Sequence, residues 1–292
     1  MKEIIKINNL TKDYGKGIGI KDVTLSVFKG EVFGFIGPNG AGKSTTIKLL
    51  LGIIKATSGT ATILDKAVWD DAVEIHKRVA YVPGDVNLWP NLTGGEIIDL
   101  FIKLQGTNHT KKREELIKKF DLDPTKKTRT YSKGNRQKIA LIAALASDAD
   151  LYILDEPTSG LDPLMEVVFQ ECINELKEQG KTIFLSSHIL SEVEKLCDRV
   201  AIIKDGQVVS VGTLDELRYL TKIRLKVETR NPIANIKELK YISDFEGSDT
   251  KFNINVESEK LNDLINKLTK FEITKLESSL PSLEELFMKH YV

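Results

Sequence analysis

Residues 31–52, EVFGFIGPNGAGKSTTIKLLLG, decide the fold. An apolar run of strand length leads into a glycine-rich turn, and a run with helical spacing follows that turn. The stretch therefore predicts a strand, a loop and a helix that begins near Lys43 and ends before Gly52.

The turn within this stretch has the spacing of a phosphate-binding P-loop, with Gly37, Gly42, Lys43 and Ser44 in the required positions. Glycines let backbone N–H groups approach phosphates, and the helix N-terminus adds a positive dipole. Lys43 is suited to neutralise the β- and γ-phosphates, and Ser44 is suited to ligate Mg²⁺. A chance match is rare once a strand before the loop and a helix after it are required. We therefore expect a nucleotide site.

The composition excludes several classes of protein. The 292 residues suffice for one large and one small domain. The 42 Lys and Arg balance the 42 Asp and Glu, so no net positive field favours nucleic acid, and we expect no nucleic-acid partner. Two cysteines, Cys172 and Cys197, are too few for a disulfide framework or a four-ligand zinc site. The N-terminus lacks the pattern of a signal peptide, and no apolar run reaches the ~18 residues of a membrane span, so we expect a cytoplasmic protein.

The region up to residue 147 predicts two subdomains around the P-loop. Residues 85–147 have helical patterns, opened by a capping box from Thr93 to Glu96 and broken by Gly106 and the lysine-rich stretch after it. We interpret them as a helical insertion. Alternation of apolar and polar residues predicts an N-terminal antiparallel β-subdomain, built from residues 3–8, 22–28 and 60–65.

The rest of the chain completes an α/β fold. Strands and helices alternate over residues 151–204, as in a parallel sheet, and one helix begins at Pro163. We expect a P-loop NTPase core within residues 1–220 and a small α+β domain over residues 221–292. The order of elements in the small domain fits a split βαβ unit. A final helix is predicted there from the capping residues Pro281, Ser282 and Glu285.

The segment LYILDEP places Asp155 and Glu156 at the end of a buried apolar strand. Two carboxylates there are costly unless a cation or hydrogen-bond donors meet them. With Mg²⁺ present, Asp155 is predicted to hold the metal through water, and Glu156 to act as general base on an attacking water. The alternative is that both residues only cap the loop before Pro157.

Three further motifs make the chain resemble the ATP-binding cassette (ABC) family: YSKGNRQK at 131–138, SGLDP at 159–163, and His188 at the end of TIFLSSH. The resemblance covers roughly residues 1–220 and implies hydrolysis of ATP. It implies that Tyr14 stacks on adenine and that His188 contacts the γ-phosphate. Without the surrounding motifs, Tyr14 would be interpreted as a surface aromatic residue and His188 as a structural histidine. The resemblance also implies a phosphate loop made of Gly37, Pro38, Asn39, Gly40, Ala41, Gly42, Lys43, Ser44 and Thr45.

The signature motif of the family is matched imperfectly here, because Lys133 replaces a glycine and Asn135 replaces the usual glutamine. Ser132 is suited to cap a helix whose N–H groups face an anion, and Gly134 permits close approach. The alternative is a simple capped helix. In the family, this motif faces the ATP of a second subunit, which implies that Ser132, Gly134 and Asn135 act across a head-to-tail dimer. Asp162 matches the residue that lines the dimer interface.

A second departure lies in YVPGDVNLWPNLT, residues 81–93. Gly84 stands where the family has a glutamine that serves the metal and the water, and Asp85 follows it. Asp85 is a candidate metal ligand, since carboxylate oxygen suits Mg²⁺. The alternative is that Asp85 only solvates the loop.

The resemblance implies the ATPase subunit of an ABC transporter, most like those of bacterial ABC-2 type exporters. Its partners would be integral membrane subunits and a second ATPase subunit, and its place the cytoplasmic side of the cell membrane. The alternatives are a soluble cassette ATPase in translation or DNA repair, and a P-loop kinase or GTPase. We also expect the helical insertion to dock a membrane subunit near Gly84, with Trp89, Leu92 and Phe101 as apolar contacts. For Phe101, burial in the insertion's own core is the competing interpretation.

Overall fold

The computed structural model describes residues 2–15, 17–104, 106, 110–219, 222–233, 236, 239 and 241–279. The chain divides into two compact units, Met1–Val211 and Gly212–Val292. The domain boundary is predicted between residues 220 and 221, and the structure describes neither of these two residues.

The larger unit contains the predicted antiparallel β-subdomain. Its strands lie in the order β2-β1-β4-β5, and the adjacent pairs are antiparallel. Their inward side chains join one apolar core with residues of the P-loop helix, including Ile47 and Leu50. The strands are β1 (Glu3–Asp13), β2 (Gly19–Phe28), β4 (Ser58–Ile63) and β5 (Lys66–Ala67).

The second sheet of this unit positions the site. Its order is β10-β9-β3-β8-β7-β6, and β3, β6, β7, β8 and β9 form parallel pairs. Every residue of β3, β7 and β8 is buried, as expected for parallel strands covered on both faces. The strands are β3 (Val32–Ile36), β6 (Val79–Val82), β7 (Leu151–Asp155), β8 (Thr182–Ser187), β9 (Arg199–Lys204) and β10 (Gln207–Thr213).

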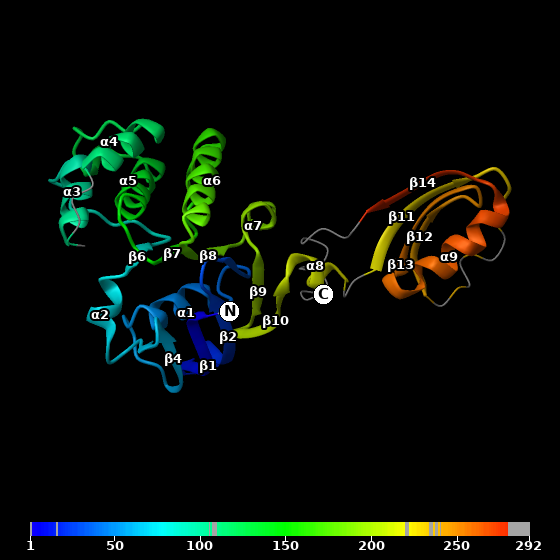
Figure 1. The fold of residues 1–292 in the computed structure, drawn as a ribbon, viewed down its shortest axis with the longest axis horizontal. Helices are drawn as coiled ribbons and strands as arrows, with labels where there is room; N and C mark the ends of the chain where they lie inside the picture. The colour runs from blue at the N-terminus through cyan, green and yellow to red at the C-terminus, as the bar shows by residue number, and fades with distance from the viewer. Residues whose placement is uncertain are drawn as a thin grey trace. The chain divides into compact units, whose positions relative to one another are not determined.

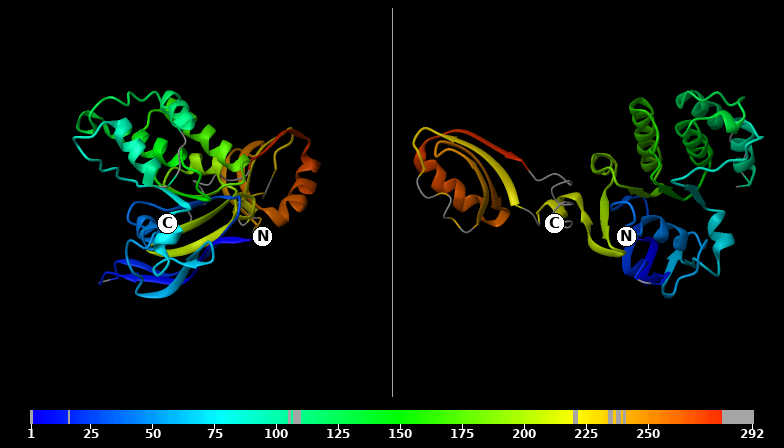
Figure 2. Two further views of the ribbon diagram at one scale, coloured as in Figure 1. Left: turned by 60° about the vertical axis from the view of Figure 1, so that its left-hand side comes forward. Right: turned by 180° about the vertical axis from the view of Figure 1, so that it is seen from behind.

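The helices of the larger unit fall into two groups. Figure 1 shows α3, α4 and α5 gathered at one end of the unit and β1, β2 and β4 at the other, and the first view of Figure 2 agrees. The helices of the insertion are α3 (Gly94–Leu104), α4 (Thr110–Lys119) and α5 (Lys133–Leu145). The remaining helices are α1 (Lys43–Leu50), α2 (Ala72–His76), α6 (Pro163–Glu178) and α7 (Leu190–Leu196).

The predicted capping box is confirmed at the start of α3. The N–H of Thr93 donates to Glu96 Oε2 at 2.6 Å, and the N–H of Glu96 donates to Thr93 Oγ1 at 3.2 Å. The expected break over the lysine-rich stretch is wrong, because that stretch forms α4. Leu116 and Ile117 are buried on α4, which packs against α5, so an apolar face stabilises the helix despite its many lysines.

The smaller unit has an α+β fold, as predicted. Its strands lie in the order β12-β13-β11-β14 with antiparallel neighbours, which is the strand order of a split βαβ arrangement. Helix α9 packs on one face of this sheet (Figure 2). The predicted final helix, with Pro281, Ser282 and Glu285, lies outside the described residues. The elements are α8 (Leu214–Tyr219), β11 (Lys222–Thr229), β12 (Ile242–Gly247), β13 (Lys251–Glu257), α9 (Leu261–Leu268) and β14 (Ile273–Ser279).

None of the helices in the described ranges combines the length and the apolar character that crossing a bilayer requires.

Candidate active site

The phosphate loop connects β3 to α1. Gly42 caps α1 with a φ of 109°, and no side chain caps the helix. The N–H groups of its first turn therefore point out of the helix toward the loop, as an anion site requires. A Cβ at Gly37 would lie 2.5 Å from the carbonyl oxygen of Ile203, so only glycine lets the loop pack this closely against β9.

Lys43 is the buried cation of this loop, with 5% of its side chain exposed. Its Nζ donates to the carbonyl oxygens of Gly37 at 2.7 Å and Pro38 at 3.2 Å. The same Nζ lies 3.1 Å from Glu156 Oε1. The ammonium group is thus held at the loop by groups that phosphate oxygens are able to replace.

The two carboxylates take different environments at the end of β7. Asp155 is buried and accepts a hydrogen bond from the Ser186 hydroxyl at 2.5 Å. Glu156 adopts a left-handed backbone with a φ of 46°, and its N–H donates to the Ser186 carbonyl at 3.1 Å and hydroxyl at 3.2 Å. Such a conformation in a non-glycine residue is strained and is held by its surroundings. The sharp turn presents Glu156 to Lys43, while Asp155 stays on the strand.

His188 completes the cluster from the end of β8. Its Nδ1 lies 2.9 Å from Glu156 Oε2, so Lys43 and His188 each contact one oxygen of the same carboxylate. The order β3-β8-β7 in the sheet explains this convergence, because the ends of three neighbouring parallel strands meet at one edge. Burial and, second, the Asp155 charge raise the pKa of the neighbouring Tyr81 to about 12, so that phenol remains neutral.

The donor set suits Mg²⁺ bound to a nucleotide. Among the described residues, no three or more His, Cys, Asp or Glu side chains form a metal cluster. Mg²⁺ typically uses only one or two carboxylates and takes its other oxygens from phosphates and water. Ser44 at the start of α1 and Asp155 at the end of β7 fit that pattern.

The structure places Gly84, and not Asp85, against Asp155. A Cβ at Gly84 would lie 3.6 Å from Asp155 Oδ2. Asp85 is exposed, and its carboxylate accepts a hydrogen bond from the Asn87 amide at 3.4 Å. The metal role of Asp85 stays a prediction, and this geometry favours the alternative in which Asp85 solvates the loop.

A second cluster joins the start of α5 to the loop before α6. Ser132 caps α5, with its hydroxyl accepting from the N–H of Asn135 at 3.3 Å. Lys133 Nζ donates to the Ser159 hydroxyl at 2.8 Å. A Cβ at Gly134 would lie 2.3 Å from the carbonyl oxygen of Gly160, so this position requires glycine. Asp162 caps α6 by accepting from the N–H of Met165 at 3.0 Å.

Sequence reasoning missed the link between these two clusters. Gln137 is buried on α5, and its amide nitrogen donates to the carbonyl oxygen of Pro157 at 3.0 Å. Pro157 directly follows Glu156. The motif YSKGNRQK contains a signal for this contact, because an amide such as that of Gln137 on the buried side of a helix needs a hydrogen-bond partner.

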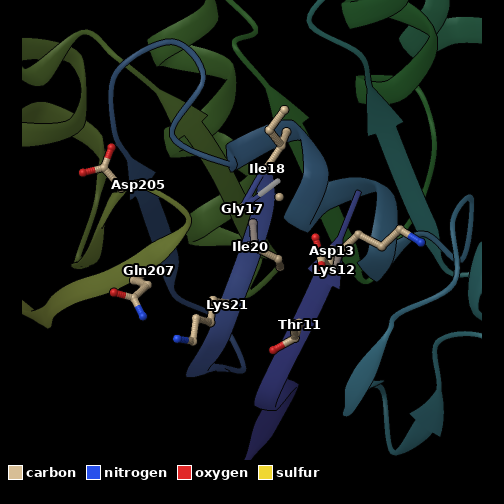
Figure 3. A pocket seen from close by; sticks show the side chains of 10 residues that line it. Thr11, Lys12, Asp13, Gly17, Ile18, Ile20, Lys21, Asp205 and Gln207 are labelled. Atoms are coloured by element: carbon tan, nitrogen blue, oxygen red, sulfur yellow. The ribbon is translucent and has the colours of Figure 1, made fainter. Parts of the chain in front are cut away.

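Tyr14 directly follows β1, whose last residues Lys12 and Asp13 line a cavity of about 430 Å³ (Figure 3). The tyrosine is 54% exposed, and Lys12 Nζ lies 5.3 Å from the centre of its ring. A Cβ at Gly42 would lie 2.6 Å from Ile20 Cγ2, so the wall of the cavity adjoins the phosphate loop. The lining residues are Thr11, Lys12, Asp13, Gly17, Ile18, Gly19, Ile20, Lys21, Asp205 and Gln207.

The fold and these clusters define a P-loop NTPase, and comparison with known proteins names its family. The ABC transporter family matches residues 20–159, and the C-terminal domain of DrrA1-3-like ATP-binding proteins matches residues 212–291. The chain is 34% identical over 299 residues to the bacitracin transport ATP-binding protein BcrA of Bacillus licheniformis, covering 99% of this chain and 97% of that protein. It is 31% identical over 302 residues to the linearmycin resistance ATP-binding protein LnrL of Bacillus subtilis (strain 168), covering 98% and 97%.

A solved dimeric structure of MJ0796, a bacterial ABC transporter cassette, is similar with a TM-score of 0.66 and 28% identity, covering 72% of this chain and 98% of that one. The chain therefore belongs to the ABC transporter family of ATP-binding proteins and is an ATPase. The predicted resemblance is confirmed, and the kinase or GTPase alternative is excluded.

We expect Lys43→Ala to weaken ATP binding about 10-fold or more, because charge-assisted hydrogen bonds contribute roughly 1.5–3 kcal/mol. Fluorescence anisotropy with a labelled ATP measures this effect. Lys48→Ala, at an exposed position on the same helix, is the matched control and should bind normally. Equal affinity in both variants would remove Lys43 from the phosphate site.

Proposed function

We propose that this chain is the nucleotide-binding subunit of an ABC-2 type exporter. It hydrolyses ATP with Mg²⁺ on the cytoplasmic face of the membrane and drives separate integral membrane subunits. The observation that carries the hydrolytic part of this proposal is the Glu156 carboxylate shared between Lys43 and His188. The names of BcrA and LnrL, which concern transport and resistance, favour this function over a role in translation or DNA repair.

The contacts of Lys43 suggest how the hydrolysis site is assembled. When ATP binds, its β- and γ-phosphate oxygens pair with the Lys43 ammonium group. They replace its contacts with the carbonyl oxygens of Gly37 and Pro38 and with Glu156. Mg²⁺, held by Ser44 and Asp155, would neutralise charge on the same phosphates. Glu156 then keeps its contact with His188 and has a free oxygen for water.

The chemical step follows from that arrangement. Water attacks the γ-phosphorus, the bond from the γ-phosphorus to the β,γ-bridging oxygen breaks, and Glu156 accepts the proton of the water. The products are ADP and phosphate. His188, on the other oxygen of Glu156, holds the base in place and is proposed to donate to a γ-phosphate oxygen.

The cavity beside Tyr14 is the proposed site of the nucleoside. Its apolar wall at Ile18 and Ile20 offers a surface for the adenine, and Tyr14 offers a ring for stacking. Figure 3 shows Asp205 and Gln207 on one side of Ile20 and Lys12 on the other, so polar groups flank that wall.

The second cluster, formed by the start of α5 and the loop before α6, is proposed to bind the ATP of a second ATPase subunit. The capped end of α5 presents Ser132 and Asn135, and the first turn of that helix contains no acidic residue. Asp162 lies on the adjoining loop and would line the interface between subunits. The subunits are therefore predicted to pair head to tail with two nucleotides between them.

An apolar groove beside Pro83, Gly84 and Asp85 is proposed to receive a membrane subunit. The groove has a volume of about 180 Å³ and adjoins Trp89, which is 54% exposed, with ring centres of Trp89 and Phe101 6.3 Å apart. Phe101 is 36% exposed, so it does not lie in the closed core of the insertion. Leu92 is partly buried and does not line the groove. The lining residues are Tyr81, Pro83, Val86, Asn87, Leu88, Phe101, Ala140, Ala143 and Ala144.

The base assignment predicts that Glu156→Gln lowers the hydrolysis rate about 100-fold or more, since general-base catalysis contributes roughly 10²–10⁴-fold. ATP affinity should be retained, because Asp155 and the phosphate loop are unchanged. Steady-state phosphate release and ATP titration measure the two effects. Turnover at the wild-type rate would refute the role of Glu156.

The dimer assignment predicts that Glu156→Gln protein sediments as a dimer with saturating Mg-ATP and as a monomer with ADP. Blocking hydrolysis preserves the γ-phosphate that Ser132 and Gly134 are proposed to contact. Ser132→Ala in the same background should reduce the dimer fraction. A single unchanged monomeric species with Mg-ATP would contradict the head-to-tail arrangement.

The docking assignment predicts that Trp89→Ala leaves thermal stability and basal ATPase activity unchanged and weakens co-purification with the membrane partner. A bulky exposed aromatic is a common anchor in protein interfaces. Trp69→Ala, at the other exposed tryptophan, is the control and should leave assembly unchanged. Unchanged assembly and transport in Trp89→Ala would remove Trp89 from the interface, and loss of folding would place it in the core.

A further inference from the structure

Glu192 is a buried carboxyl group that the hydrolysis step does not use. It lies in the first turn of α7, four residues after His188, and is 5% exposed. Its Oε2 accepts a hydrogen bond from the Ser187 hydroxyl at 2.9 Å. Its Oε1 is buried and has no hydrogen-bond partner within the part of the chain that the structure describes. A buried acceptor without a donor is costly, so its presence calls for a reason.

Ser187 carries the influence of Glu192 to both sides of His188. The Ser187 hydroxyl donates to Glu192 and also accepts from the N–H of Ile189 at 3.0 Å. The residue before His188 and the residue after it are therefore held by one hydroxyl group. From this fixed segment the His188 ring reaches Glu156 Oε2 at 2.9 Å.

This arrangement differs from ordinary helix capping. In a capping box, a Glu in the third position of the helix accepts directly from the N–H of the capping residue. Here the capping residue is Ile189, and the Ser187 hydroxyl stands between its N–H and Glu192. The carboxyl thus acts on the position of the histidine segment, and only through it on the helix end.

Burial raises the pKa of Glu192, and the Ser187 hydroxyl opposes this shift. The contact that holds the carboxyl is therefore its hydrogen bond with Ser187.

We propose that Glu192 is a positioning residue that fixes His188 against Glu156. The link runs from Glu192 through the Ser187 hydroxyl to the backbone at Ile189, and so to His188. The proposal rests on the hydrolysis mechanism proposed above. It adds a buried carboxyl group that sets the contact between the histidine and the base.

The variant Glu192→Leu tests the proposal, because leucine fills a similar volume and removes the acceptor. Replacing a buried polar group with an apolar one of similar shape often preserves folding. We expect the melting temperature to stay the same or rise, kcat to fall about 10-fold, and KM for ATP to stay within about twofold, as for a small misplacement of a catalytic group. Glu192→Gln should restore most of kcat, since its amide oxygen still accepts from Ser187.

A double-mutant cycle tests the link through Ser187. Ser187→Ala should lower kcat, and Ser187→Ala combined with Glu192→Leu should be no slower than Glu192→Leu alone. Glu194→Gln on the same helix is the matched control and should behave as wild type. Fully additive losses in the double variant would overturn the link.

NMR of the nucleotide-free protein gives a readout that does not depend on turnover. The ring nitrogen signals of His188, assigned by their loss in His188→Ala, should move in Glu192→Leu and stay in place in Glu194→Gln. Unmoved signals with unchanged kcat would overturn the proposal. So would a loss of thermal stability with kcat falling only in proportion to the folded fraction, since that result indicates a purely structural role. A wild-type protein without ATPase activity would refute the proposed function, while the NMR comparison still decides the role of Glu192.

Discussion

The contact between the Lys43 ammonium and the Glu156 carboxylate, at 3.1 Å, is the interaction on which the rest of the site depends. A buried lysine needs an anion near it, and the phosphate loop itself offers only carbonyl oxygens. Glu156 meets that need because the left-handed turn after β7 aims its side chain at the loop. The same ion pair joins the start of α1, the helix that follows β3, to the residue after β7, although β8 lies between β3 and β7 in the sheet.

The last two residues of β8, Ser186 and Ser187, make separate sets of hydrogen bonds. Ser186 binds Asp155 and the backbone of Glu156, and Ser187 binds Glu192 and the backbone of Ile189. Side chains alternate across a strand, so adjacent serines reach opposite faces of the sheet. One face then serves the carboxylates, and the other serves the helix that follows His188. Two hydroxyl groups thus place the base and the histidine relative to each other.

Local sequence patterns predicted much of the fold. The P-loop helix from Lys43, the capping box at Thr93 and the antiparallel and parallel sheets follow from spacing and periodicity. The site was harder to predict, since partners distant in sequence decide it. Nothing near Glu192 indicates that Ser187 links its carboxyl to the backbone beside His188, and nothing near Asp85 indicates that Gly84 is the residue that faces Asp155. The lysine-rich α4 was missed because two buried residues outweigh a polar composition.

The central claim is that nucleotide phosphates take Lys43 from Glu156 and leave the carboxylate free to act as base. A crystal structure of the wild-type chain with Mg²⁺ and a non-hydrolysable ATP analogue tests it directly. We expect Lys43 Nζ to contact β- and γ-phosphate oxygens, beyond ion-pair distance from Glu156, while His188 remains at the site. A bound nucleotide with Lys43 still paired to Glu156 would contradict it.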